Sequence, residues 1–227
     1  MFKKLLLTSA LLATFATAHA QSSQNFGVTG TVTPGACNVT LTNGIVNLGT
    51  LTQATVKAYA PTAATNVFYT VPTVNVPISI VCGAATKVGV SFIDNKSGKV
   101  LPLNFEDVLR FGMTDGSAGT AAIGTYQMSF SSTTIDSVAT VVNAFLNATN
   151  GTAVWSTKVA GTTTPNNFIA PGYTTTFTKT TGSIIPETFT TLGGNLAIQI
   201  FLGKTYMDAA TSIVTPNGSG TLTLVYL

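Results

Sequence analysis

Apolar and polar residues alternate one by one through much of this sequence, a period that matches the β-strand. Successive side chains of a strand point to opposite faces, so alternation buries one face and leaves the other in water. Thr, Ser and β-branched residues are abundant, and helix signals are nearly absent. The alternating segments are Phe26 to Val32, Val74 to Val81, Val88 to Ile93, Tyr126 to Phe130, Leu196 to Leu202 and Leu222 to Tyr226.

Residue pairs that tolerate a positive φ angle, as hairpin turns require, occur between these segments. They are Asn43-Gly44, Asp115-Gly116, Asn150-Gly151 and Asn217-Gly218. Together with the alternation they predict a single all-β domain, an antiparallel sandwich or barrel. The segment Val138 to Leu146 fits a helix or a bent, buried strand equally well. Pro102 to Arg110 predicts a connection between strands, with a single helical turn as the alternative.

The first 20 residues predict a cleaved export signal. Lys3 and Lys4 give a positive start, an apolar run from Leu5 to Ala16 follows, and Ala18-His19-Ala20 places small residues around the expected cut. The run is shorter than the roughly 20 residues that span a bilayer. The mature chain is expected to begin at Gln21 and to hold 207 residues.

Charged groups are scarce, with 10 Lys or Arg and 7 Asp or Glu. They make up 7% of the chain, against roughly 25% in an ordinary domain, so nucleic acid is not an expected partner. The single histidine, His19, lies in the predicted signal, so the mature chain lacks imidazole for catalysis or metal binding. The seven acids have no spacing typical of a hydrolase and are expected to be solvated. We therefore expect no enzyme activity, no cofactor and no metal site.

Cys37 and Cys82 are the only cysteines. Because an exported chain meets an oxidising compartment, these two cysteines are expected to form a disulfide. The closed loop of about 46 residues would stabilise the fold by roughly 4 kcal/mol in the chain-entropy model. The alternative, a reactive or metal-bound thiol, lacks a neighbouring histidine or cationic cluster in the sequence.

The segment before the first cysteine predicts a strand that can leave the body of the domain. Pro34-Gly35 follows it directly; proline donates no ladder hydrogen bond, and glycine permits a swivel. One face of the strand presents three apolar side chains and a glycine gap. That face carries Phe26, Val28, Gly30 and Val32.

The last alternating segment places Leu222, Leu224 and Tyr226 on one face. It is predicted to form an uncovered sheet edge, which proteins normally protect. A strand that can leave at one end and an open edge at the other predict that an incoming strand adds to a neighbour's sheet. Such an exchange builds a fibre.

These features resemble the subunits of chaperone-usher pili: Val28-Thr29-Gly30-Thr31-Val32 before Cys37, a second cysteine 45 residues later, and a penultimate tyrosine. The resemblance implies an immunoglobulin-like sandwich that lacks its last strand. It implies that a periplasmic chaperone fills the groove until the N-terminal extension of the next subunit replaces it. An outer-membrane usher, export through the periplasm to a surface pilus, and a role in adhesion or biofilm formation are implied as well.

Carried onto this sequence, the resemblance assigns an extension at residues 21–33 and a sandwich domain at residues 34–227. The donor-strand positions would be Phe26, Val28, Gly30 and Val32, the bridge beside the groove Cys37 and Cys82, and the terminal strand of the groove Leu222, Leu224 and Tyr226. Two features depart from the family. Val214 stands where many pilins have a glycine, and the domain is longer than a typical shaft subunit. The resemblance does not cover residues 100 to 190.

Two other functions fit an exported sandwich. In a carbohydrate-binding domain, Trp155, Tyr126 or Tyr173 would stack on a sugar ring, although a lone tryptophan in a β domain is more often part of the core. In a self-complemented monomer, residues 26 to 32 would fill the molecule's own groove.

Overall fold

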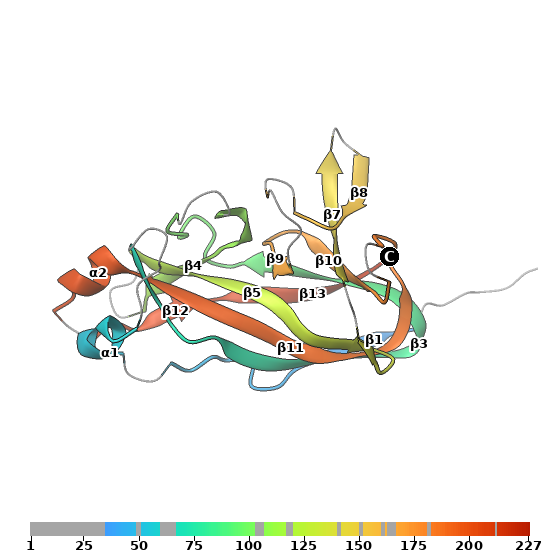
Figure 1. The fold of residues 1–227 in the computed structure, drawn as a ribbon, viewed down its shortest axis with the longest axis horizontal. Coiled ribbons are helices and arrows are strands. Elements are labelled where there is room, and N and C mark those ends of the chain that lie inside the picture. Colours follow the sequence, from blue (N-terminus) through green and yellow to red (C-terminus); the bar gives the residue numbers. More distant parts are fainter. Residues whose placement is uncertain are drawn as a thin grey trace, which may run out of the picture. The chain divides into compact units, whose positions relative to one another are not determined.

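The computed structural model describes residues 35–48, 51–59, 67–102, 107–116, 120–139, 142–149, 152–159, 162, 167–180, 183–211 and 213–227. Pro34–Leu227 forms one compact unit (Figure 1). The predicted export signal, residues 1–20, and the predicted donor strand with Phe26, Val28, Gly30 and Val32 lie outside the described residues.

Most of the described chain is β-structure. The strands are β1 (Cys37–Leu41), β2 (Phe68–Thr70), β3 (Val74–Asp94), β4 (Phe111–Asp115), β5 (Ala122–Ile135), β6 (Val138–Ala139), β7 (Val142–Thr149), β8 (Thr152–Ser156), β9 (Phe168–Ile169), β10 (Thr174–Thr178), β11 (Thr188–Gly203), β12 (Pro216–Gly218) and β13 (Gly220–Tyr226). The helical elements are α1 (Gln53–Lys57), the 3₁₀ turn η1 (Asp107–Leu109) and α2 (Lys204–Ala209). Every strand pairing is antiparallel, which confirms the predicted all-β class.

The longest strand, β3, shows why alternation predicts these elements. In its first half the side chains of Val76, Ile78 and Ile80 are buried, while Pro77 and Ser79 between them are exposed. The burial of every second side chain is the two-residue period of a half-buried strand. Two of the predicted segments lie in β3, and one lies in each of β5, β11 and β13, so the sequence pattern located the central strands.

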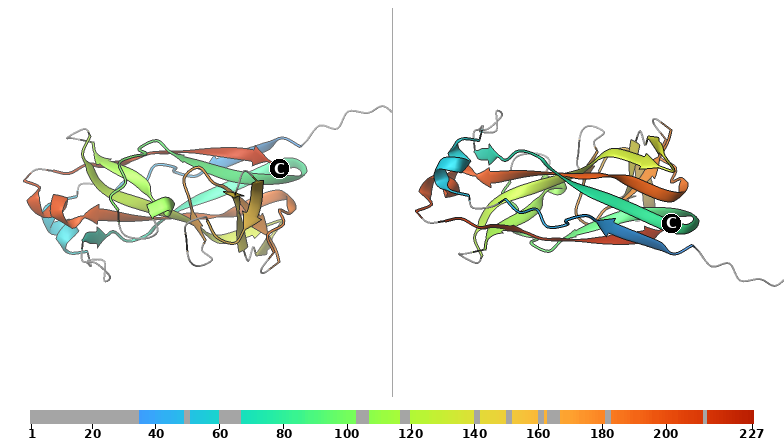
Figure 2. Two further views of the ribbon diagram at one scale, coloured as in Figure 1. Left: turned by 90° about the horizontal axis from the view of Figure 1, so that it is seen from above. Right: turned by 90° about the horizontal axis from the view of Figure 1, so that it is seen from below.

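The strand β3 belongs to both layers of the sandwich. Its first half pairs with β1 on one side and β11 on the other, which gives the order β1-β3-β11-β5. The strand then bends beside the C-terminal end of the chain (Figure 2), and its second half pairs with β13 and β10. These orders correspond to strands A-B-E-D and C-F of an immunoglobulin-like sandwich, which confirms the predicted fold class.

Aromatic rings join the two layers in the core. Phe130 of β5 lies 5.0 Å from Phe177 of β10 and 6.2 Å from Phe92 of β3, measured between ring centroids. Phe177 in turn lies 6.4 Å from Phe189 of β11. Phe130 and Phe189 come from one layer and Phe92 and Phe177 from the other, so these contacts hold the layers together through a large apolar area.

The central region adds a small second core to the sandwich. Val138 to Leu146, which fitted a helix or a strand, forms β6 and part of β7. The hairpin β7-β8 extends the second layer through β10 (Figure 1). A separate apolar cluster packs beside it and comprises Leu109, Phe145, Val159 and Ala170. The predicted connection at Pro102 to Arg110 contains the single 3₁₀ turn η1.

One local turn prediction was wrong. Asn217-Gly218 does not form a hairpin turn, because both residues lie in β12, which pairs with β4.

The two short helices, α1 and α2, were not predicted, because neither has a clear sequence signal. Tertiary contacts hold them: the Tyr69 hydroxyl donates a 2.8 Å hydrogen bond to Asp208 of α2, and the amide of Gln53 in α1 donates to the carbonyl of Asp208 at 2.8 Å. Neither helix of the described chain has the length or apolar character that a membrane crossing requires.

Candidate functional site: an apolar groove between β1 and β13

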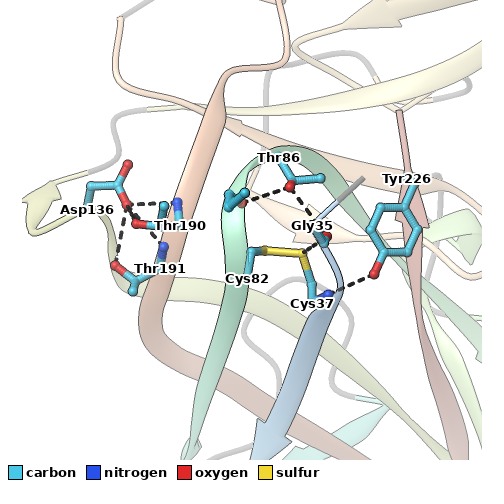
Figure 3. Close-up of a disulfide and its surroundings, with 9 residues drawn as sticks. Gly35, Cys37, Cys82, Thr86, Asp136, Thr190, Thr191 and Tyr226 are labelled. Carbon is cyan, nitrogen blue, oxygen red and sulfur yellow. Dashed lines mark hydrogen bonds between the residues drawn. A yellow bond between two sulfur atoms is a disulfide. The ribbon is translucent and has the colours of Figure 1, made fainter. Parts of the chain in front are cut away.

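The disulfide joins β1 to β3 at one end of the sandwich (Figure 3). Cys37 and Cys82 are direct partners in the β1-β3 ladder, and the predicted bridge between them is confirmed. From this point β1 runs away from the bend of β3. The strand β13 runs toward the bend, because its last paired residue, Tyr226, lies opposite Val88. The two strands therefore run in opposite directions, in different layers.

A hydrogen bond joins these two strands beside the disulfide. The backbone N–H of Cys37 donates to the hydroxyl of Tyr226 at 2.8 Å (Figure 3). The predicted terminal-strand residues are thus placed in two ways. Leu222 and Leu224 are half-buried and pack against the main core, while Tyr226 is 48% exposed and its hydroxyl reaches across to β1.

The outer edges of both strands offer backbone groups for pairing. Within the described residues, β1 and β13 each pair only with β3. The amide of Leu227 donates to Lys87 of β3. Because ladder bonds alternate along an antiparallel strand, the backbone groups of Leu222 and Leu224 point away from β3. The backbone amide of Thr42 donates to the carbonyl of Pro77 in β3. By the same alternation, the backbone N–H and C=O groups of Val39 and Leu41 point away from β3, to the outer edge of β1.

An apolar groove of about 460 Å³ lies between these edges, at the end away from the disulfide. Strands β5 and β11 contribute its floor, the segment after β1 one wall, and the segment from β12 to β13 the other. No described residue that lines the groove is charged. The lining consists of Leu41, Gly44, Ile45, Val46, Leu48, Phe92, Met113, Tyr126, Met128, Leu196, Ile198, Ile200, Leu222 and residues 215–220.

Several apolar side chains of the groove are open to solvent. Ile45 is 86% exposed, and Val46, Leu48 and Ile198 are only half-buried. A contiguous exposed apolar patch is typical of an interaction site or a ligand-binding groove. The arrangement can bind an extended, uncharged, largely apolar segment that also supplies backbone hydrogen bonds.

Two buried carboxylates fix the wall formed by residues 215–221. Asp94 accepts 2.8 Å hydrogen bonds from the backbone amides of Lys96 and Gly112. These bonds hold the turn that follows β3. In that turn, the backbone amide of Asn95 donates to the carbonyl of Ser219 in the wall. Asp115 accepts from the amide of Thr215 at 3.1 Å. Both aspartates are less than a tenth exposed, so the expectation that all acids are solvated was wrong for them.

The hydroxyl of Tyr206 donates a 2.8 Å hydrogen bond to the second oxygen of Asp115. This bond to the carboxylate raises the pKa of Tyr206 above its ordinary value. The residue anchors α2 to the end of β4 and therefore supports the wall of the groove from outside. No local pattern predicts this contact, because 91 residues separate its partners in the chain.

Asp136 fastens the β5-β6 turn to β11 near the disulfide (Figure 3). Its carboxylate accepts hydrogen bonds from the amides of Thr190 and Thr191, both at 3.0 Å, and from the Thr190 hydroxyl at 2.8 Å. These bonds, with Lys179 at 3.7 Å, lower the pKa of Asp136 to about 2. Asp136 has a φ of 48°, a conformation that asparagine also adopts readily.

Asp136→Asn is expected to lower the free energy of unfolding at neutral pH by about 1 kcal/mol, a small value because the site is partly exposed. A carboxylate with a lowered pKa stabilises the fold above its unfolded pKa of about 4, and the effect disappears as the pH falls to about 2. Urea unfolding of both proteins from pH 7 to pH 2 measures the difference. An equal difference at pH 2 and pH 7 would contradict a charge-based role.

The aromatic residues proposed for sugar stacking do not come together. Tyr126 lies in the main core, Tyr173 packs against the small second cluster, and Trp155 lies half-buried on β8. Within the described ranges, no three His, Cys, Asp or Glu side chains are arranged to hold a metal ion.

The groove floor is the part of the site that sequence reasoning missed. Ile198 and Ile200 lie in a segment correctly predicted as a strand, and alternation placed them on one face. Only the fold shows that this face forms the floor of the groove together with residues of β5. The exposed Ile45 directly follows the turn at Asn43-Gly44, and an exposed isoleucine beside a turn was the available signal.

Fold and site together define an immunoglobulin-like sandwich with an apolar groove between two strand edges. A family model described as "Protein of unknown function (DUF1120)" matches residues 26–134. This span includes both cysteines, β1 and the part of β5 that contributes to the groove floor. No curated protein and no solved structure matches the chain.

Proposed function

We propose that this protein is a structural subunit of a surface pilus that assembles by strand donation between neighbouring subunits. The observation that carries the proposal is the uncharged apolar groove between the outer edges of β1 and β13. The sequence supplies a matching segment, with Phe26, Val28, Gly30 and Val32 on one face. A periplasmic chaperone and an outer-membrane usher are the proposed assembly partners, and adhesion or biofilm formation is the proposed role.

The energy available from donation is large enough to hold a polymer. Burial of Phe26, Val28 and Val32 in the groove contributes roughly 5 to 9 kcal/mol before the cost of association. Backbone bonds to β13 and β1 add about 0.5 to 1.5 kcal/mol each. The Cys37–Cys82 disulfide supports an exported location, because such bonds persist in oxidising compartments.

Chain geometry favours a neighbouring molecule over the same molecule as the source of the strand. Val32 is three residues from Gly35, a reach of about 10 Å, and Gly35 lies at the disulfide end, within 3.7 Å of the Cys37 sulfur through its carbonyl. Insertion into its own groove therefore requires a reversal beside β1, and the strand would run parallel to β13. A neighbour's strand can run antiparallel to β13, which is the longer edge and the slightly more stable pairing.

Export of the full chain and of a chain without residues 21–33 tests the proposal. The full chain is expected to give polymers that resist heat in detergent and appear as a ladder on gels. The shortened chain is expected to give none, because it has a groove and no strand to donate. Size analysis of both proteins is the measurement.

Two results would overturn the proposal. The first is the absence of a ladder with the full chain together with an unchanged, stable monomer after the deletion. The second is a full chain that stays monomeric and loses stability on deletion, which would favour self-complementation.

A further inference from the structure

The hydroxyl of Tyr126 differs in its hydrogen bonding from the hydroxyls of three other tyrosines. The hydroxyls of Tyr69, Tyr206 and Tyr226 bond to Asp208, Asp115 and the Cys37 amide. Tyr126 is only 7% exposed and its ring stacks on Phe111 at 5.1 Å. Nevertheless its hydroxyl has no hydrogen-bond partner among the described residues, and the residue lines the groove.

The hydroxyl lies beside the first residue of β13. A Cβ atom built on Gly220 would stand 3.4 Å from the Tyr126 oxygen, and one on Gly218 would stand 2.6 Å from the ring. A side chain at position 218 would therefore collide with the phenol ring, and one at position 220 would come into van der Waals contact with its oxygen. Its oxygen is at the end of the groove away from the disulfide.

The hydroxyl of Tyr126 stays protonated and can therefore donate a hydrogen bond. Burial raises the pKa of Tyr126 above its ordinary value, and the nearby negative charge of Asp94 raises it further. The group is therefore neutral and carries its proton at every physiological pH. The oxygen is not among the fully buried, unpartnered polar atoms of the described residues, so water can reach it in the monomer. A strand that fills the groove would cover it, and a covered hydroxyl without a partner destabilises its site.

We propose that the Tyr126 hydroxyl donates a hydrogen bond to an oxygen atom of the strand that fills the groove, and so helps to determine which strands bind. This inference rests on the proposed function and adds a polar requirement to an otherwise apolar site. A strand antiparallel to β13 brings its C-terminal end to Gly220. The candidate acceptors are then the backbone carbonyl oxygens near Thr31 and Thr33, because the side chains of these two threonines are on the face opposite Val32.

The test compares Tyr126→Phe with Tyr69→Phe in the full chain. For Tyr126→Phe we expect the lifetime of the polymer in denaturant to fall about fivefold, the effect of one average hydrogen bond. The unfolding midpoint of the monomeric fraction should not fall, because the hydroxyl has no protein partner there. Tyr69→Phe should lower the unfolding midpoint of the monomer and leave the lifetime of the polymer unchanged, because its hydroxyl bonds to Asp208 and neither residue lines the groove.

Carbon-13 labelling of the tyrosine ring carbon that bears the oxygen provides a readout independent of stability. The signal that disappears in Tyr126→Phe is expected to shift between monomer and polymer. Thr31→Val and Thr33→Val are the controls for the donated strand. Neither should shorten the lifetime, because both side chains are on the face away from the groove and the expected acceptor is a backbone carbonyl.

Equal lifetimes of wild-type and Tyr126→Phe polymers, with no shift of the labelled signal, would overturn the inference. A midpoint that falls as much in the monomer as in the polymer would also overturn it, because the hydroxyl would then have a structural role only. Failure of the wild-type chain to polymerise at all would instead count against the proposed function.

Discussion

Replacing Gly30 with leucine is expected to abolish polymers of the full chain. In the proposed strand, Gly30 shares the inward face with Val28 and Val32, and it leaves a gap between their side chains. A leucine there would meet the groove floor, where overpacking destabilises by typically 1 to 3 kcal/mol, and would also prevent the flanking side chains from seating. The measurement is the amount of heat-resistant ladder produced by the exported variant.

Thr31→Leu is the matched control for this substitution. It adds similar bulk one residue further along, on the face that is expected to point to solvent, and should leave the ladder in place. Both variants should show the same near-ultraviolet circular dichroism as the wild-type monomer. A Gly30→Leu chain that polymerises as well as Thr31→Leu would contradict the assigned face of the strand.

Removal of the disulfide is the second large expected effect. The double variant Cys37→Ala, Cys82→Ala should lose roughly 3 to 4 kcal/mol of unfolding free energy, the value expected for closing a loop of this length. The strand β1 is the element most affected, because β3 is its only partner within the described part of the chain and its inward side chains Val39 and Leu41 are only half-buried. Urea unfolding of the oxidised wild type and the variant measures the loss.

The same change should impair assembly, because β1 contributes one edge of the groove. Hydrogen exchange of the β1 amides is expected to accelerate in the variant more than exchange in β11, which lies between β3 and β5. Wild-type protein in reductant provides the control, and it should match the double variant. A loss below 1 kcal/mol with unchanged exchange in β1 would show that the ladder alone holds this strand.

Alternation predicted the central strands because each of them buries one face against a single core. It did not predict that β3 is continuous through the bend between Val81 and Val88. The intervening sequence Cys82-Gly83-Ala84-Ala85-Thr86-Lys87 has the composition of a turn. The pairing of Thr86 and Lys87 with β11 keeps it in the sheet, and a partner from another part of the chain is invisible to a local pattern.

The helices and buried acids escaped prediction for a related reason. The helix α1 has five residues, too few to be stable alone. The Thr52 hydroxyl caps it by accepting a hydrogen bond from the amide of Thr55, but this bond forms only when the helix is already folded. Asp94, like the other acids, was expected to be solvated, and it begins a polar turn. The turn is present, but Gly112 approaches so closely that a Cβ on it would stand 2.2 Å from the Lys96 carbonyl, and this packing buries the carboxylate.

The shared strand β3 has a mechanical consequence for a fibre built as proposed. Tension that arrives through a strand held along β13 would pass by shear across the β13-β3 ladder, around the bend, and into β1, which continues toward the extension. The Cys37–Cys82 bond lies on that route. The load would then be carried by one strand and a covalent cross-link, while β5, β11 and the aromatic core stay unstretched.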